Sequence, residues 1–353
     1  FGRKGEEYLT RRKNGESAAS TRNSHPMKRI VLAAAIVILL LGAFALYWNA
    51  SPVPAPGGGR PMLVAHRGLA QTFDLAGVTA ETCTARRIHP PTHPFLENSL
   101  ASIEAAFRLG ADVVEIDIQP TTDGQFAVFH DWSVDCRTDG KGTTRSKSLS
   151  ELKALDIGYG YTADDGATFP FRGRGVGLLP SLDEVLATFP DKRLLINVKS
   201  NDRAEGERLA TRLARLSPQQ RSRLMVYGGA TPVAVVRERV PDIRTMSVDW
   251  EKKCLLRYLL VGWTGYVPKA CARGLLLIPS NNARWLWGWP EPLIRRMRAL
   301  STEVVLLGPR QEHDFSTGID TEADFRHLPP GYTGGIWTNR IDRIAPLVAA
   351  GAP

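Results

Sequence analysis

The sequence predicts an α/β protein, a TIM-type (β/α)8 barrel preceded by an N-terminal transmembrane helix. Three observations carry this prediction. An uninterrupted apolar segment lies near the start, a Pro/Gly-rich stretch follows it, and strand-like runs then alternate with helical ones from residue 62 to residue 353. Dividing that length by ~150 residues would give two domains, but barrels of this size are common as one domain, so we expect a single large one.

The first element is a basic tail, residues 1–26. Met27 directly precedes the apolar run, so this tail is either native or sequence upstream of the native start, and we leave it out of the fold prediction. With Lys28 and Arg29 it accounts for most of the net charge of +9: residues 1–29 carry eight Lys/Arg and three Glu, which leaves +4 for the remainder. A weakly basic remainder without a Lys/Arg run disfavours nucleic-acid binding and tolerates an anionic substrate.

The second element, residues 27–48, is predicted to be a transmembrane anchor or a signal. Its 19 residues from 30 to 48 carry no charge, which is about the length that a bilayer core requires of a helix. Basic residues stand directly before it, so the positive-inside rule places the N-terminus in the cytoplasm and the barrel on the extracytoplasmic side, periplasmic or extracellular. Residues 43–45, "AFA", fit a cleavage site, so a cleaved signal and a secreted barrel stay open; the length of the run favours an anchor.

Residues 49–61, "NASPVPAPGGGRP", are predicted to be a linker, and the domain of residues 62–353 begins after it. The expected strands are 62–66, 112–117, 125–130, 193–199, 223–228, 243–248, 274–279, 303–308 and 334–339, and the expected helices are 99–109, 148–155, 181–189, 203–216, 231–239, 251–260 and 291–299. This alternation favours a parallel barrel over a doubly wound sheet.

Polar side chains follow the apolar runs at several strand ends. Glu115 and Asp117 share one face of their strand, because side chains alternate along a strand, and two carboxylates among apolar neighbours need a cation or hydrogen-bond donors. In a parallel barrel the carboxyl ends of the strands meet at the same mouth. We therefore expect these strand-end residues to converge: His66, Arg67, Glu115, Asp117, His130, Asp131, Asn197 and Lys199.

This set of groups suits one kind of chemistry. Carboxylates bind a hard cation, imidazoles transfer protons near neutral pH, and Arg or Lys donors stabilise an oxyanion. Phosphodiester hydrolysis needs all three.

Four segments carry a family resemblance: "AHRG" at 65–68, "ENS" at 97–99, residues 110–131, and "LPSLDEVL" at 179–186. With them, residues 62 to about 200 closely resemble the glycerophosphodiester phosphodiesterase family, and in pattern other barrel-type phospholipid phosphodiesterases; "GGIWTNRID" at 334–342 resembles the family's closing strand more loosely. The resemblance implies a metal-dependent barrel enzyme that cleaves glycerol-phosphate diesters.

The resemblance also implies roles for individual residues. His66 and His130 correspond to the acid–base pair, and Arg67 and Lys199 to phosphate contacts. Glu115 and Asp117 correspond to ligands of one divalent cation, Mg²⁺ or Ca²⁺, and Glu97 to a position near the metal or a glycerol hydroxyl.

Two features depart from the family pattern. Asn197 stands in "NVK" where many members carry Glu, so we expect its amide oxygen to be the third metal ligand, with one negative charge fewer at the site. Residues 69–96 replace a short connection, and we expect this insertion at the active-site mouth. Within it, His89 and His93 lie in Pro-rich sequence without regular spacing and are interpreted as solvated loop residues rather than metal ligands.

The four cysteines lie beyond the anchor, in a compartment where disulfides persist. Four cysteines allow three pairings. Cys83 and Cys136 both follow catalytic strands, and Cys254 and Cys271 belong to one local segment, so we expect these two pairs; free buried thiols are the alternative.

The predicted function is metal-dependent hydrolysis of glycerophosphodiesters, or of lysophospholipid or phospholipid head groups, to a glycerol phosphate-type monoester and an alcohol. Water or the substrate's own glycerol hydroxyl attacks phosphorus, and both stay open, as do the head group, the metal and the oligomeric state. The alternative is a membrane-anchored barrel with weakened catalysis that binds lipid or envelope components, which the missing third carboxylate suggests. No protein partner is implied.

Residues 255–289 contain four tryptophans among aliphatic residues: Trp263, Trp285, Trp287 and Trp289. Tryptophan favours bilayer interfaces, so one hypothesis is that this segment contacts the membrane surface and lets phospholipid head groups reach the site. Ordinary packing in the barrel and its outer helices is the alternative.

Overall fold

The computed structural model describes residues 25–50, 59–79, 82–310 and 317–351. Almost all of the predicted basic tail and most of the predicted linker lie outside these residues. The chain divides into two compact units, Phe1–Tyr47 and Trp48–Pro353.

The N-terminal apolar segment forms one long helix, α1 (His25–Asn49). Its residues Met27–Asn49 are, within the described part of the chain, the one helix long and apolar enough to cross a membrane. A signal sequence near an N-terminus meets the same test. The predicted segment 27–48 therefore agrees with the helix in its bounds and composition.

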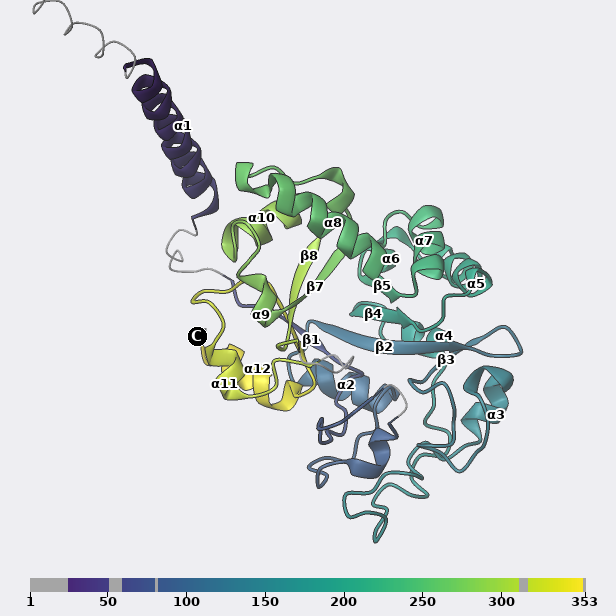
Figure 1. Ribbon diagram of the computed structural model, residues 1–353. Coiled ribbons are helices and arrows are strands. Elements are labelled where there is room, and N and C mark those ends of the chain that lie inside the picture. The colour runs from purple at the N-terminus through teal and green to yellow at the C-terminus, as the bar shows by residue number, and fades with distance from the viewer. Residues whose placement is uncertain (1–24, 51–58, 80–81, 311–316, 352–353) are drawn as a thin grey trace, which may run out of the picture. The chain divides into compact units, whose positions relative to one another are not determined.

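The second unit is a nearly closed barrel of parallel strands, the fold class that the sequence predicts (Figure 1). Around the barrel the strands follow the order β6-β5-β4-β2-β1-β9-β8-β7. A single parallel bridge, Thr245 with Gly274, links the last strand back to the first. The eight strands are β1 (Met62–Ala65), β2 (Val113–Pro120), β4 (Arg193–Val198), β5 (Leu224–Gly228), β6 (Arg244–Ser247), β7 (Leu275–Pro279), β8 (Glu303–Leu307) and β9 (Gly335–Thr338).

The predicted strand 125–130 has a different place from the others. Its central part, β3 (Phe126–Val128), pairs antiparallel with the end of β2 instead of joining the barrel. The turn between them closes through Gly124, whose φ of +76° favours glycine, and whose N–H donates to the Thr121 carbonyl at 3.1 Å. This hairpin returns the chain to the barrel mouth, which brings His130 there although no barrel strand ends at it.

Helices cover the outside of the barrel. Serine caps begin several of them: the Ser181 hydroxyl accepts from the Glu184 backbone, and Glu184 bonds back, the capping box that "SLDE" indicates. The helices of this unit are α2 (Leu100–Arg108), α3 (Leu149–Lys153), α4 (Leu182–Thr188), α5 (Arg203–Ala214), α6 (Pro218–Arg221), α7 (Ala230–Arg239), α8 (Val248–Val261), α9 (Ser280–Ala283), α10 (Glu291–Ala299), α11 (Glu322–Arg326) and α12 (Ile341–Ala349).

The barrel interior is filled by one buried side chain from each of the eight strands. Because side chains alternate along a strand, the residue two positions further on points inward above this layer. That position is occupied by His66 on β1, Glu115 on β2 and Asn197 on β4. The layer therefore forms the floor of the mouth, and it consists of Val64, Val113, Leu195, Met225, Met246, Leu275, Val305 and Trp337.

Both predicted disulfides are confirmed, Cys83–Cys136 and Cys254–Cys271. The first joins the insertion to the segment that follows β3, and apolar residues from both segments pack together in a core of their own, with Ile88 and Val134 among them. The second joins α8 to the segment before β7. The insertion is thus fixed to the barrel by a covalent bond and by packing.

Candidate active site

Two carboxylates occupy the centre of the mouth. Glu115 and Asp117 follow Val113 on the inward face of β2, and both are buried. Glu115 accepts hydrogen bonds from the Tyr227 hydroxyl at 2.8 Å and the Arg67 backbone at 3.2 Å. The Nε2 atom of His66 lies 3.9 Å from its second oxygen.

Asp117 is surrounded by four donors. Its Oδ2 accepts from Asn98 Nδ2 at 3.1 Å and lies 3.3 Å from Nε of Arg67. Its Oδ1 accepts from Asn197 Nδ2 at 2.9 Å and lies 3.7 Å from the ammonium of Lys199. The sequence leaves open what balances the two buried carboxylates. In the structure the chain's own cations and amides contact Asp117 and balance part of this negative charge.

The two carboxyl groups differ in their pKa. Burial first, and then the charge of Asp117, raise the pKa of Glu115 to about 8. Burial also favours the neutral form of Asp117, but the Lys199 ammonium, then His130 and Arg67, outweigh it and hold the pKa of Asp117 well below its usual range. The protein's own groups therefore favour the charged form of Asp117 and the neutral form of Glu115.

His66 is held in one tautomer by its neighbours. Its Nδ1 lies 2.6 Å from Oδ1 of Asn339, and Asn339 in turn donates its own amide to Asp320 at 2.8 Å, so Nδ1 of His66 carries the hydrogen. Arg67 Nε donates to the other ring nitrogen, Nε2, at 3.2 Å. Burial, and next the Arg67 charge, push the pKa of His66 well below its usual value. The ring is neutral, and Nε2 faces the carboxylates.

His130 has a carboxylate partner. Its Nδ1 lies 2.6 Å from Oδ1 of Asp131, whose Oδ2 accepts from Arg137 Nε at 2.8 Å. Burial and then Arg67 lower the pKa of His130, less strongly than that of His66, while Asp131 opposes the shift. The pKa of Asp131 is held low because Arg137 and His130 outweigh the effect of its burial.

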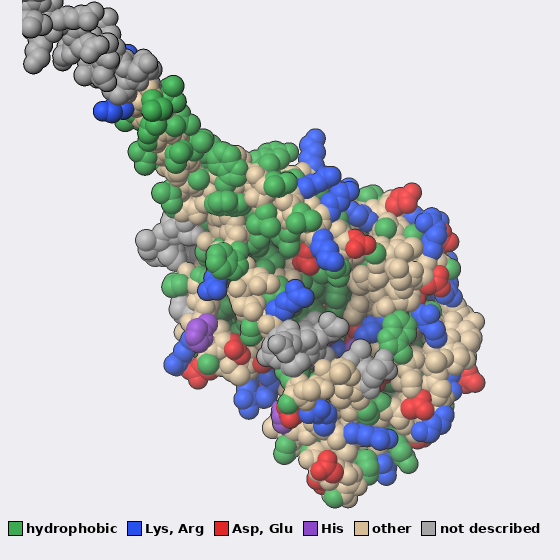
Figure 2. Space-filling model, viewed as in Figure 1, with side chains coloured by type: hydrophobic (Ala, Val, Ile, Leu, Met, Phe, Trp, Pro, Cys, Tyr) green, Lys and Arg blue, Asp and Glu red, His purple; other side chains and the backbone are tan. Residues whose placement is uncertain are grey.

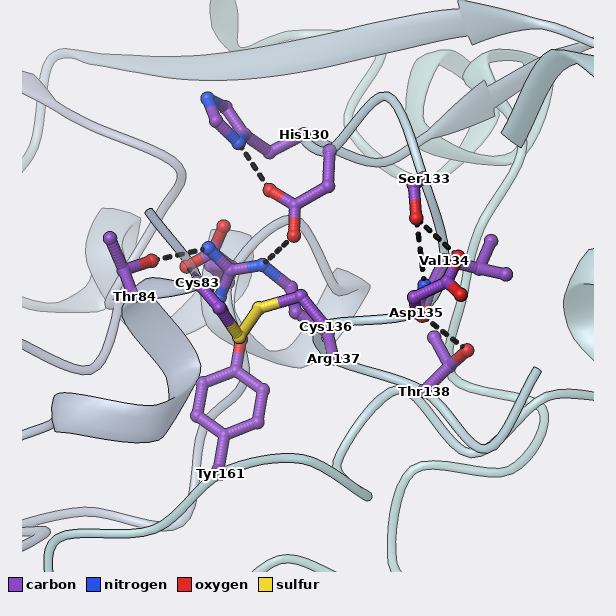
Figure 3. The surroundings of a disulfide bond; sticks show 12 residues. Cys83, Thr84, His130, Ser133, Val134, Asp135, Cys136, Arg137, Thr138 and Tyr161 are labelled. Carbon is purple, nitrogen blue, oxygen red and sulfur yellow. Dashed lines mark hydrogen bonds and ion pairs between the residues drawn. A yellow bond between two sulfur atoms is a disulfide. The ribbon is translucent and has the colours of Figure 1, made fainter. Parts of the chain in front are cut away.

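Arg137 connects the insertion to these groups. Its guanidinium donates to Glu97 at 3.1 Å, to the Tyr161 hydroxyl at 2.6 Å and to the Thr84 hydroxyl at 2.8 Å. Figure 3 shows Thr84, Arg137 and Tyr161 around the Cys83–Cys136 disulfide, with His130 nearby. The disulfide joins the residue before Thr84 to the residue before Arg137.

The network continues to the metal-ligand candidates through Glu97. Glu97 accepts from Arg137 on one oxygen and from Arg67 Nη1, at 3.0 Å, on the other. A buried chain of alternating charges therefore runs from Asp131 through Arg137, Glu97 and Arg67 to Asp117. It links Asp131, the partner of His130, to Asp117 of the carboxylate pair in one ion-paired unit.

The "HRG" turn has an unusual backbone. Arg67 and Asn98 adopt φ of +60°, a region that side chains other than glycine rarely occupy. Gly68 has φ of +79°, and a Cβ there would lie 2.6 Å from the Ser102 hydroxyl, so only glycine fits. The turn aims the Arg67 side chain into the network.

A cavity of about 210 Å³ opens beside this unit. The insertion contributes Gln71, Thr72, Phe73 and His89 to its wall, and the barrel contributes His66, Arg67, Glu97, Arg340 and Arg343. Several of these side chains are cationic, which suits a small anionic substrate.

Three of the residues with predicted roles line this cavity, namely His66, Arg67 and Glu97, and the others are joined to them by the contacts described above: Glu115, Asp117, His130, Asn197 and Lys199. Within the insertion, His89 is exposed, and His93 is half-buried with its ring 3.0 Å from Nε2 of Gln71. Sequence reasoning missed further functional candidates, each with a local signal: Asn98 lies inside "ENS", Tyr227 lies two positions after an interior strand residue, and Asn339 ends the closing strand. Arg137 carries no such signal.

Part of the chain is similar in sequence to known proteins. Residues 66–222 match the glycerophosphoryl diester phosphodiesterase family. A glycerophosphodiester phosphodiesterase of Caldanaerobacter subterraneus is 37% identical over 103 residues, which are 29% of this chain and 39% of that protein. A Bacillus subtilis glycerophosphodiester phosphodiesterase is 34% identical over 114 residues, 31% of this chain and 38% of that protein. The chain thus spans about two fifths of the length of these curated relatives.

Solved structures share the fold over most of the chain. The glycerophosphoryl diester phosphodiesterase domain of a Mycobacterium tuberculosis protein covers 83% of this chain and 98% of its own, with a TM-score of 0.57 at 18% identity. A phosphodiesterase of Oleispira antarctica, solved with the product sn-glycerol-3-phosphate, covers 83% of this chain and 98% of its own, with a TM-score of 0.52 at 18% identity. These likenesses establish the barrel fold.

Proposed function

We propose that this chain, which carries the glycerophosphoryl diester phosphodiesterase family sequence over residues 66–222, hydrolyses glycerophosphodiesters to a glycerol phosphate monoester and an alcohol. One observation carries the proposal: two imidazoles, each fixed by an acceptor at Nδ1, lie at the same mouth as a buried carboxylate pair and two cations. Phospholipids are a second substrate class, because their head groups are attached through the same kind of phosphodiester bond.

The two imidazoles differ in a way that suggests their roles. His66 is the more strongly neutral of the two, and its Nε2, which carries no hydrogen and faces the carboxylates, would exchange its contact with Arg67 for the attacking hydroxyl, so it is the base that takes the proton. His130 has Asp131 to stabilise its protonated form, so it is the acid that protonates the departing alkoxide. The attacking hydroxyl belongs to water, which gives the monoester directly, or to the substrate's glycerol, which gives a cyclic phosphate that water then opens to the monoester.

Arg67 and Lys199 are the proposed phosphate contacts. Lys199 reaches the mouth from the end of β4 and keeps part of its side chain exposed. Arg67 lines the cavity while Glu97 and Asp117 fix its guanidinium. Two fixed cations would stabilise the extra charge that gathers on the phosphoryl oxygens in the transition state.

Glu115, Asp117 and Asn197 are the residues that would hold a divalent cation, Mg²⁺ or Ca²⁺. The raised pKa of Glu115 supports this fit, because a dication would balance the charge that Arg67 and Lys199 leave over. Asn197 would turn its amide so that the oxygen replaces the nitrogen that now faces Asp117. Within the described residues no three His, Cys, Asp or Glu side chains lie close enough together to form a metal cluster. The proposed ligand set therefore needs the Asn197 amide beside the two carboxylates. When bound, the cation would polarise a phosphoryl oxygen.

We place the barrel on the extracytoplasmic side, anchored by α1 or released by its cleavage. Both cysteine pairs are disulfide-bonded, which fits an oxidising compartment.

The test is release of glycerol 3-phosphate from glycerophosphocholine by the purified full chain, with and without a chelator. We expect turnover that the chelator abolishes and that His66→Ala and His130→Ala each reduce by at least about 100-fold. Activity unchanged in both histidine variants would refute the mechanism. Substrate binding without turnover in the wild type would instead support the lipid- or envelope-binding barrel.

A further inference from the structure

Large apolar side chains are exposed on one side of the barrel unit. Leu260 is 75% exposed and Trp285 is 70% exposed, values unusual for such side chains. Figure 2 shows hydrophobic side chains gathered over the region that Figure 1 labels α8. We call this set the α8 face: Leu256, Leu259, Leu260, Tyr266, Trp285 and Trp287.

The α8 face is held in shape from beneath. The Cys254–Cys271 disulfide fixes α8 to the segment before β7. The indole of Trp287 donates to the Leu259 carbonyl at 2.9 Å, and the buried Tyr258 hydroxyl donates to the Trp287 carbonyl at 2.7 Å. The apolar side chains are therefore presented outward by a fixed frame. Trp263 and Trp289 of the same sequence segment are half-buried and do not belong to the face.

The topology locates this face at one end of the barrel. β6 ends at Ser247 on the mouth side, and α8 then runs back, so its last turns lie toward the amino ends of the strands. The chain also enters β1 at Met62 from the amino end. The last turns of α8 and the start of β1 therefore lie at the same end of the barrel.

The chemistry of the face also fits a bilayer surface. Tryptophan and tyrosine place an apolar ring and a polar edge at the level of lipid head groups. Lys252, Lys253 and Arg257 are exposed on the same helix, and the Arg284 guanidinium lies 5.0 Å from the Trp285 ring. An apolar surface beside a row of cations complements a bilayer that contains anionic lipids.

We propose that the α8 face docks on a phospholipid bilayer that contains anionic lipid, and that this docking turns the catalytic mouth toward the aqueous phase. The second part rests on the proposed function: a mouth turned to the aqueous phase receives the water-soluble glycerophosphodiester already proposed as the substrate, and not a phospholipid embedded in the same bilayer. The hypothesis from the tryptophan-rich sequence has two parts, and the proposal keeps only the first. The segment meets the membrane, but it does so at the end of the barrel opposite to the site, so it does not bring phospholipid head groups to the site.

The test uses the full chain in nanodiscs of phosphatidylcholine and phosphatidylglycerol. Bromine atoms on lipid tails quench nearby indoles. The difference in emission between the wild type and the double variant Trp285→Phe/Trp287→Phe reports these two tryptophans, and brominated lipid should reduce this difference. Trp132 is the matched control, because it is 48% exposed and lies two residues after His130 at the mouth. The emission lost in Trp132→Phe should be insensitive to brominated lipid and accessible to acrylamide.

Two results would overturn docking. Acrylamide quenching of Trp285 and Trp287 as strong as that of Trp132 would mean that the face stays in water. Protection from both quenchers would mean that a second copy of the chain covers it.

A substrate comparison tests the orientation separately. In the same nanodiscs we expect release of glycerol 3-phosphate from added glycerophosphoglycerol and no loss of the disc's own phosphatidylglycerol. Comparable turnover of both substrates would refute the orientation. Quenching as expected together with turnover of neither substrate would refute the proposed hydrolase function and leave the docking face supported.

Discussion

Asn197 and Asp117 face each other across two adjacent strands. They are partners in the register of β4 and β2, and the Asn197 amide donates to Asp117 at 2.9 Å. An amide at this position bonds to the buried carboxylate without adding a third negative charge. The Lys199 ammonium, 3.7 Å from Asp117, completes the balance. The metal affinity of the site should therefore respond to residue 197 in a defined direction.

We predict that Asn197→Asp tightens binding of Mg²⁺ or Ca²⁺ about tenfold, ~1.4 kcal/mol. A further close charge attracts a dication more strongly than that, but Lys199 offsets part of the gain by pairing with the new carboxylate. Glu115→Gln and Asp117→Asn should weaken binding sharply. Titration calorimetry of the three variants measures this directly, and equal affinity in all of them would mean that the carboxylate pair does not bind metal.

At the scale of elements, each of the two disulfides holds a different part of the barrel. Cys83–Cys136 holds the insertion beside Arg137 and so supports the chain of charges that reaches His130. Cys254–Cys271 holds α8, which is remote from that chain of charges. Their removal should therefore have separable effects.

We predict that replacing Cys83 and Cys136 by alanine lowers both stability and kcat. The bond closes a span of 53 residues, for which the chain-entropy argument gives about 4 kcal/mol. The matched control, Cys254→Ala/Cys271→Ala, opens a span of 17 residues and should cost about 3 kcal/mol while leaving kcat on a soluble diester unchanged. Urea unfolding and steady-state kinetics check both variants, and equal kcat losses in the two would contradict a specific link to His130.

Helix α8 carries a buried carboxyl group, Glu251, which accepts from the Leu277 backbone of β7 at 2.7 Å. Burial raises its pKa to about 7 from an ordinary value of 4.5. The folded chain therefore keeps a proton that the unfolded chain releases between these values. Its contribution to stability is complete below pH 4.5 and is lost as the pH rises through about 7.

We predict that the free energy of unfolding falls by about 3 kcal/mol more between pH 4.5 and pH 8 in the wild type than in Glu251→Gln. Glutamine keeps the acceptor for Leu277 and does not titrate. Urea unfolding at several pH values measures the difference, and Glu104→Gln, at an exposed position of α2, should keep the wild-type slope. Parallel pH profiles for wild type and Glu251→Gln would show that Glu251 is ionised in the fold.

For the whole molecule, the sequence predicts the barrel well because its signals are local and periodic. Short apolar runs that alternate with helical segments predict each barrel strand, and the alternation rule correctly places Glu115 and Asp117 on one face. The antiparallel pairing of 126–128 escapes this reasoning, because a hairpin strand and a barrel strand have the same local pattern. The Arg137 network escapes it too, since its partners lie up to 53 positions away in the chain and meet only through tertiary packing.

The layer of eight interior side chains has a consequence for the proposed hydrolysis. One side chain from every strand fills the barrel below the carboxylates, so the site is reached from the mouth. In the proposed reaction the diester would enter, and both products would leave, by this same opening. A phosphate monoester that stays bound there would block the next diester, so turnover would depend on the rate of product release.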